Sequence, residues 1–119
     1  MSWGRFEGAV RVELLDDGRT VRICEPFAYV RANGEAYEVP ADFVCDGASI
    51  PRILWPLSGG PFEGKHRAAA LVHDYLYRLF IGTRANADRV FYEGMRCCGV
   101  NVISARAKYT AVRLFGPRW

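Results

Sequence analysis

The chain has 119 residues, of which 50% are hydrophobic and 24% charged, and its formal net charge at pH 7 is +3. This composition is typical of one soluble globular domain. No apolar run approaches the roughly 20 residues that a membrane-spanning helix needs. The start, MSWGRFEGAV, has no apolar segment of the signal-peptide type, so we expect cytoplasmic synthesis without export.

The charge is distributed unevenly along the chain. Residues 1–60 carry a net charge of −3, and residues 61–119 carry +6. The basic half is compatible with an anionic partner such as a phospholipid surface, although a solvated basic face is the simpler explanation. There is no strong nucleic-acid signal.

The cysteines have no C-x-x-C spacing, and two of them are neighbours in the chain, where disulfides rarely form. We therefore expect four buried, reduced thiols, as in a reducing compartment. They are Cys24, Cys45, Cys97 and Cys98.

Residues 1–45 have the alternating pattern of short β-strands. In AVRVELL and TVRIC, apolar and polar residues alternate on either side of a DDGR turn. The stretch FAYVRANGEAYEV predicts a second hairpin with Asn33 and Gly34 at its tip, because this pair tolerates the positive φ of a tight turn. We expect one small antiparallel sheet.

Residues 46–64, DGASIPRILWPLSGGPFEG, predict an ordered loop because they are rich in proline and glycine. Residues 65–119 predict a core of three helices, at 65–81, 84–98 and 102–115. Glycines at 82, 99 and 116 end them, and Thr83 caps the start of the second. Apolar residues recur at helical spacing on the first two: Ala69, Val72, Leu76, Phe80, Val90, Phe91 and Met95.

The first two helices carry the residues with chemical potential. His73 and Asp74 lie about 100° apart on the first helix, and Tyr77 follows His73 by one turn. If the two helices pack antiparallel, as their short connection favours, Asp88 near the start of the second approaches His73. A histidine held by one carboxylate is the arrangement of a general base.

Two further carboxylates, Asp46 and Asp74, are oxygen ligands of the kind that hard cations bind. Together with a backbone carbonyl of the glycine-containing loop, they predict a Ca²⁺ site beside His73 and Asp88. Each residue also has an ordinary structural explanation: a turn for Asp46, and a favourable position near a helix N-terminus for Asp88. The residues alone leave both alternatives open.

Four blocks in order, DGASIPR with a following Trp, AALVHDYLYR, RANADRVFY and YTAVRLFG, resemble a phage- and prophage-associated family known as domain of unknown function 1353. The resemblance covers residues 43–116. It implies a protein of the host cytoplasm or of the virion, with virion proteins or a host factor as partners. That family has no established activity, so it does not assign a reaction.

The same blocks are similar, more distantly, to the small secreted bacterial and fungal phospholipases A2. Together with the hairpins predicted in residues 1–45, that resemblance implies an α+β fold here, in which a small antiparallel sheet precedes a three-helix phospholipase A2-like core. It implies His73 as general base, Asp88 as its orienting partner and Tyr77 as support. It also implies Ca²⁺ held by the carboxylates and the carbonyl of the loop, namely Asp46, Asp74 and Gly47.

Two departures separate the chain from those phospholipases. The disulfide that ties their calcium loop to the helix falls at Ala48 and Ala70 here, so the covalent tie is absent. The N-terminal β region has no counterpart in those mostly helical enzymes. It could cover the site or bind a partner.

Two functions of different classes follow. The first is a virion or host-interaction module in which the His/Asp site only fixes the packing, and the lack of a known reaction in the nearer family favours it. The second is a calcium-dependent hydrolase of phospholipid esters that acts at a membrane surface. A metal phosphohydrolase is disfavoured, because the chain has only two histidines, His66 and His73.

Overall fold

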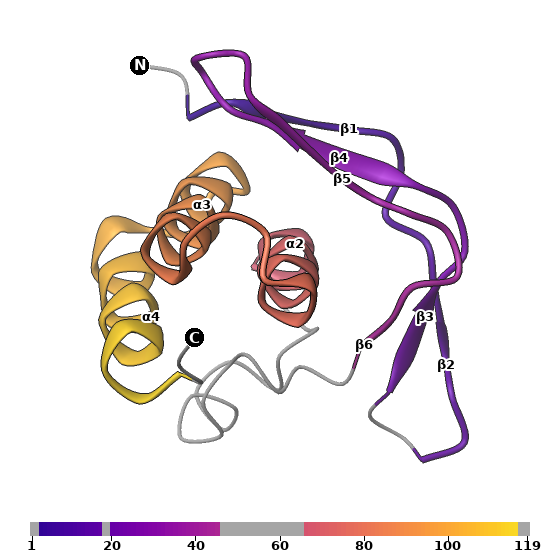
Figure 1. Cartoon of the computed structure of the whole chain (residues 1–119). Coiled ribbons are helices and arrows are strands. Elements are labelled where there is room, and N and C mark those ends of the chain that lie inside the picture. Colours follow the sequence, from indigo (N-terminus) through magenta and orange to yellow (C-terminus); the bar gives the residue numbers. More distant parts are fainter. Residues whose placement is uncertain (1–2, 18–19, 46–65, 117–119) are drawn as a thin grey trace.

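The computed structural model of the chain combines two small antiparallel sheets with three helices, an α+β architecture (Figure 1). It describes residues 3–17, 20–45 and 66–116. The sheets form a curved layer along one side of the helices, with α2 nearest to it and α4 farthest away. Within the described ranges, no helix is long and apolar enough to cross a membrane.

The first sheet has the order β1-β4-β5 and consists of Arg5–Glu7, Phe27–Val30 and Ala36–Val39. Strands β4 and β5 form the hairpin predicted around Asn33 and Gly34, and Phe27 pairs with Val39 at its open end. Gly34 has a φ of 93°, a value that glycine adopts without strain. Strand β1 adds to the other edge of β4, with Arg5 opposite Val30.

The second sheet has the order β2-β3-β6 and consists of Val12–Leu14, Val21–Ile23 and Val44–Cys45. Strands β2 and β3 form the first predicted hairpin, with Val12 opposite Ile23. The expectation of one sheet was therefore wrong, because the two hairpins belong to two separate sheets. Each recruits its third strand from a segment outside its own hairpin, a pairing that local alternation does not reveal.

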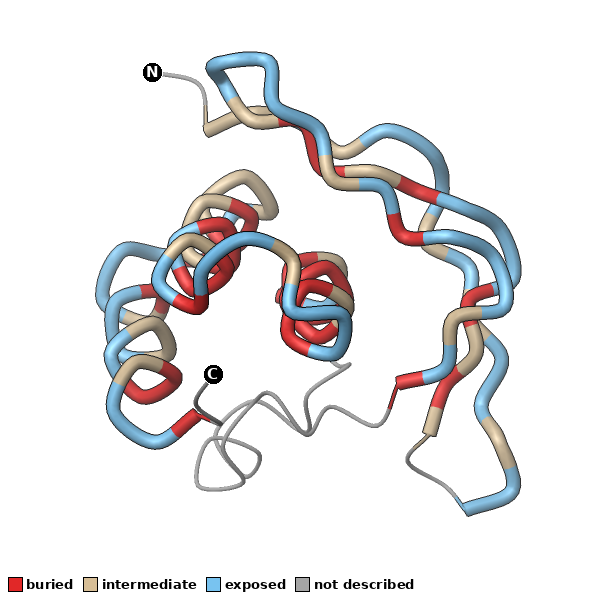
Figure 2. Tube along the Cα trace, in the orientation of Figure 1, coloured by how far each residue is buried: buried red, intermediate tan, exposed pale blue. Residues whose placement is uncertain are grey.

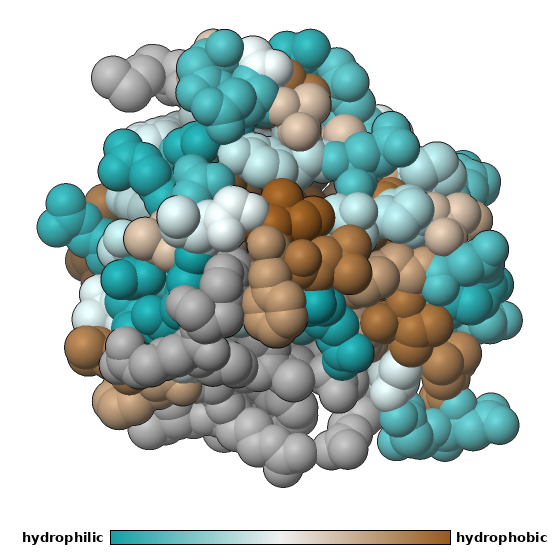
Figure 3. Space-filling view, in the orientation of Figure 1, coloured by the Kyte–Doolittle hydropathy of each residue, from teal (hydrophilic) through white to brown (hydrophobic). Residues whose placement is uncertain are grey.

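The helices are α2 (Arg67–Leu79), α3 (Arg84–Cys97) and α4 (Val102–Phe115). As predicted, the Thr83 hydroxyl accepts from the Asn86 amide at 3.0 Å and caps α3. Helix α2 ends before the expected residue 81, because Phe80 takes a left-handed conformation at its C-cap. Phe80 was expected on the apolar face of this helix, but its side chain is exposed. Hydrophobic surface gathers at the centre of the face shown in Figure 3.

Helices α2 and α3 pack antiparallel and very close together. Ala69 lies beside Gly94, His73 beside Phe91, and Tyr77 hydrogen-bonds to Asp88, so the order of contacts runs in opposite directions along the two helices. A Cβ atom on Gly94 would lie only 2.9 Å from the Ala69 Cβ. Two small residues, Ala69 on α2 and Gly94 on α3, therefore allow the helices to approach closely at this position.

The main core lies between α2, the start of α3 and the sheets, and a second cluster lies between α3, α4 and the first turn of α2. Buried residues in Figure 2 concentrate on α2 and on the sides of its neighbours that face it. Phe43 and Tyr75 extend the core with an edge-on ring contact at 5.1 Å. All four cysteines are free, but the prediction that they are all buried was wrong, because only Cys45 is fully buried and Cys24 is exposed.

Candidate functional site: a buried histidine–aspartate pair

His73 and Asp88 meet across the α2–α3 interface. His73 lies in the middle of α2, and Asp88 lies near the start of α3. The His73 Nε2 and Asp88 Oδ1 atoms are 2.7 Å apart, and both residues are fully buried. The antiparallel pairing places the beginning of α3 beside the second half of α2. The hydrogen bond expected from the sequence is therefore present.

The Asp88 carboxylate accepts from two more side chains. The Tyr77 hydroxyl donates to Oδ1, and Arg113 Nη1 donates to Oδ2 at 3.0 Å. Tyr77 reaches the carboxylate because it follows His73 by one helical turn. A carboxylate removed from water is stable as an anion only when such donors and a cation replace its hydration. Here residues of α2 and α4 converge on one residue of α3.

Two aromatic rings enclose the His73 imidazole. The Tyr77 ring centroid lies 4.2 Å from it and the Phe91 centroid 4.8 Å, both at tilted angles. These contacts fix the plane of the imidazole, and the hydrogen bond to Asp88 fixes the position of Nε2 within that plane. The side chain is therefore held in a single orientation before any ligand binds.

Burial lowers the pKa of His73, because the interior solvates an imidazolium poorly, and the neighbouring Asp88 offsets this effect only in part. His73 is therefore neutral at pH 7, and its Nε2–H donates to Asp88. The basic lone pair is then on Nδ1. Burial acts to raise the pKa of Asp88, but hydrogen bonds from His73, Tyr77 and Arg113 outweigh it and leave the pKa below its usual value. Burial raises the pKa of Tyr77, which remains a neutral donor.

Two arginines that the sequence patterns did not single out complete the surroundings. Arg113 bonds to Asp88, as described. Arg84, buried at the start of α3, donates from Nη2 to the carbonyl oxygens of Val112 at 2.7 Å and Arg113 at 2.8 Å. It thereby ties α3 to the last turn of α4, the turn that carries Arg113. For Arg113, the only sequence signal was its position among apolar residues in TAVRLFG, and an arginine in such a position is more commonly a solvated surface charge.

The predicted calcium ligands are only partly within the described residues. Asp74 is buried on α2 next to His73, with Arg78 Nε 3.5 Å from its Oδ2. Asp46, Gly47 and Ala48 lie outside the described residues. Within the described ranges, no three His, Cys, Asp or Glu side chains are grouped so as to hold a metal ion. Asp74 is a buried carboxylate of the kind that a hard cation binds, and the calcium site as a whole stays a prediction.

Comparison with known proteins places this chain in a family. The sequence profile of a family described as "Protein of unknown function (DUF1353)" matches residues 21–112. The chain belongs to the DUF1353 family. The match begins at residue 21, earlier than the residues 43–116 that carried the resemblance. It therefore includes β3 to β6, so most of the β region is a family feature.

Two relatives of this DUF1353 chain come from Sinorhizobium fredii (strain NBRC 101917 / NGR234). One, described as "Uncharacterized protein y4jT", is 37% identical over 98% of this chain and 35% of its own length. The other, "Uncharacterized protein y4iH", is 38% identical over 91% of this chain and 45% of its own length. The chain thus spans less than half the length of these curated relatives. No solved structure matches it.

Proposed function

We propose that this DUF1353 chain is a hydrolase of carboxylic esters in which His73 activates a water molecule. The observation that carries the proposal is the 2.7 Å contact between His73 Nε2 and Asp88 Oδ1. It holds a neutral imidazole in one tautomer, with the basic nitrogen on the side away from the carboxylate. This is what a general base requires before it can take a proton.

The proposed reaction needs no covalent intermediate with the protein. Nδ1 of His73 takes one proton of the water as its oxygen bonds to the ester carbonyl carbon, and the carbonyl π electrons move onto the carbonyl oxygen. Asp88 stabilises the imidazolium that forms, since its carboxylate is already bonded to Nε2. The proton then passes from Nδ1 to the departing alkoxide as the carbon–oxygen bond breaks.

The charge that develops on the carbonyl oxygen needs a cation or donors nearby. In the proposal, Asp74, Asp46 and the Gly47 carbonyl would hold a Ca²⁺ ion there. When bound, such an ion supplies electrostatic stabilisation of the oxyanion. Asp74 supports this assignment because it is a buried carboxylate adjacent in sequence to His73.

We propose a glycerophospholipid as the substrate class, cleaved at the sn-2 ester. The support is the similarity of the HDYLY segment and of the Asp88 block to the small phospholipases A2, together with the His73–Asp88–Tyr77 contacts. The excess of positive charge in residues 61–119 favours attraction to an anionic lipid surface. The apolar segment ILWPL at 53–57, which lies outside the described residues, would then contribute to an acyl-binding wall.

The test is release of fatty acid from mixed phosphatidylcholine and phosphatidylglycerol vesicles, with calcium or with a chelator. We expect calcium-dependent release by the wild type and its loss in His73→Gln and Asp88→Asn. His66→Gln is the matched control, because it changes the other histidine, which is also buried on entry to α2. Wild-type protein that releases no fatty acid, or a His73→Gln variant that stays active, would overturn the proposal.

A second candidate is a non-enzymatic module of a phage virion or of a host interaction. The non-enzymatic part of this candidate is favoured by the complete burial of His73 and Asp88 and by the three donors that satisfy the carboxylate, a pattern that also serves packing alone. This candidate predicts that His73→Gln lowers the melting temperature while no hydrolysis is detected. It also predicts the chain in purified particles from induced cells, and its absence from them would count against a virion role.

A further inference from the structure

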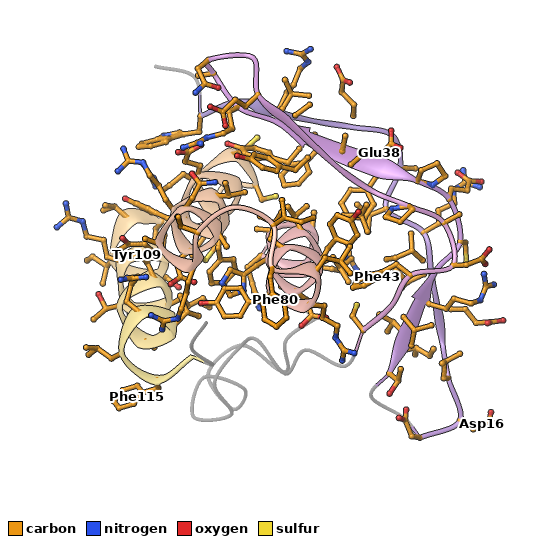
Figure 4. The ribbon with its side chains drawn as sticks, in the orientation of Figure 1. Asp16, Glu38, Phe43, Phe80, Tyr109 and Phe115 are labelled. Atoms are coloured by element: carbon orange, nitrogen blue, oxygen red, sulfur yellow. The ribbon has the colours of Figure 1, made fainter. Side chains whose placement is uncertain are left out.

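A pocket separate from the His73 site opens between the N-terminal segment, α3 and α4. It has a volume of about 400 Å³, within the range of small-molecule sites. Its apolar lining consists of the rings of Trp3, Tyr92 and Tyr109. Its polar lining consists of Arg89, Glu93, Arg106 and Thr110. Neither His73 nor Asp88 is among these residues, and Figure 4 shows Tyr109 on the α3–α4 side of the molecule.

The three rings form a continuous series across the pocket. Trp3 and Tyr92 have centroids 5.8 Å apart, and Tyr92 and Tyr109 have centroids 5.7 Å apart. These distances are typical of packed aromatic pairs. Each ring is only half-buried, so the series keeps accessible aromatic surface within the pocket. Such a surface suits a planar ring of a ligand, which would stack on it.

The charges in the pocket favour an anion. Glu93 is the only acid among the described residues that line it, and both its oxygens are bound by Arg31, at 3.0 Å and 2.7 Å. This bidentate pair neutralises Glu93 within the protein. Arg89 and Arg106 lie at the rim, both exposed, and Arg89 Nε also lies 3.5 Å from Glu93 Oε2. Helix α4 carries no acidic residue that would offset Arg106.

The same charges exclude the other ligand that aromatic rings recognise well, a quaternary ammonium group. Such a cation needs ring faces without a competing positive charge. Here the Arg96 guanidinium already lies over the Trp3 ring, 5.8 Å from its centroid. The two arginines at the rim would repel a second cation. The pocket therefore suits a ligand that combines a planar ring with a negative charge.

We propose that this pocket binds a nucleoside phosphate, either free or as one unit of a single-stranded nucleic acid. The base stacks on Tyr92 and Tyr109, and the phosphate lies between Arg89 and Arg106. A guanidinium can pair with two phosphate oxygens at once, which gives the contact direction as well as charge. The site is independent of ester hydrolysis.

Calorimetric titrations of the full chain test the proposal with AMP, adenosine, inorganic phosphate and choline as probes. We expect saturable binding of AMP. Adenosine and phosphate alone should each bind at least about ten-fold more weakly, because each lacks one half of the contact. Phosphate binding as tight as AMP binding, or binding of choline but not AMP, would overturn the assignment.

Variants locate the binding site. Arg106→Gln and Tyr109→Leu should each weaken AMP binding about ten-fold. Arg11→Gln is the matched control, since Arg11 is an exposed arginine on the β side with Glu25 as its acidic neighbour, and it should leave AMP binding unchanged. Melting curves of all three variants establish that they are folded. AMP binding that is insensitive to both pocket variants would refute the site.

A short single-stranded DNA distinguishes the two sources of the ligand. Tighter binding of the oligonucleotide than of AMP, with a steep decrease as salt rises, identifies nucleic acid as the partner. Equal binding of the two identifies the free nucleotide. Failure of both to bind would overturn the proposal, whatever the outcome of the vesicle assay.

Discussion

Replacing Asp88 with asparagine removes the negative charge on which three donors converge, while the size of the side chain is almost unchanged. His73 Nε2 lies 2.7 Å and Arg113 Nη1 3.0 Å from its oxygens, and Tyr77 is the third donor. In the variant, the single amide oxygen accepts either from His73 and Tyr77 or from Arg113, and the amide NH₂ group faces the donors on the other side.

The magnitude follows from the nature of each contact. A hydrogen bond to a charged group contributes about 1.5–3 kcal/mol and a neutral one about 0.5–1.5, so His73 and Tyr77 each lose roughly 1 kcal/mol. Arg113 is partly solvated, and its loss adds at most about 1 kcal/mol. We expect a total loss of about 2–3 kcal/mol. This is a large share of the roughly 5–15 kcal/mol stability of a typical domain.

Urea unfolding followed by circular dichroism measures this loss, and the melting temperature should fall by about 10 °C. The matched control is Asp42→Asn, the same chemical change at an exposed residue whose Arg22 partner lies 2.6 Å away. An exposed pair contributes less than about 1 kcal/mol. If Asp88→Asn loses no more stability than Asp42→Asn, the account of a charged, buried acceptor is wrong.

Three further predictions concern pH and packing. The folded-state pKa of His73 is below its unfolded value of 6.5, so the unfolded chain binds the extra proton and stability falls as pH decreases from 6.5, by up to about 1.4 kcal/mol per unit. Urea unfolding at several pH values should show this slope in the wild type and a smaller one in His73→Gln; equal slopes would contradict it. Gly94→Ala should lower the free energy of unfolding by about 1 kcal/mol in the same assay. The new Cβ atom would lie only 2.9 Å from the Ala69 Cβ, and this overpacking exceeds the gain in helix propensity. Adding Ala69→Gly should restore the stability. A more stable Gly94→Ala would refute this packing. Arg113→Gln should lower the melting temperature more than Arg78→Gln, whose partner Asp74 is 3.5 Å away; the reverse order would count against the Arg113–Asp88 bond.

The parts of the fold that local sequence determines could be predicted. The Asn33–Gly34 turn and the Thr83 cap each depend on a few neighbouring residues, so their patterns were sufficient. The His73–Asp88 contact was also predictable. A connection of a few residues between two helices leaves little choice of packing direction, and that direction fixes which residues meet.

The rest depends on contacts between distant segments. Nothing local indicates that β1 pairs with β4 or that β6 joins β3, and these pairings decide that there are two sheets. Arg113 resembles a surface charge until α4 is packed on α3. Phe80 accepts a left-handed conformation that glycine usually provides, and this shortened α2 relative to the expected helix.

The central claim is that His73 is neutral and donates from Nε2 to Asp88. A long-range ¹H–¹⁵N correlation spectrum of the imidazole nitrogens measures this directly, with the signals of His73 assigned by their loss in His73→Gln. The account predicts the Nε2-protonated neutral tautomer at neutral pH, still present below pH 6.5, the unperturbed value. An imidazolium at neutral pH, or a proton on Nδ1, would contradict it.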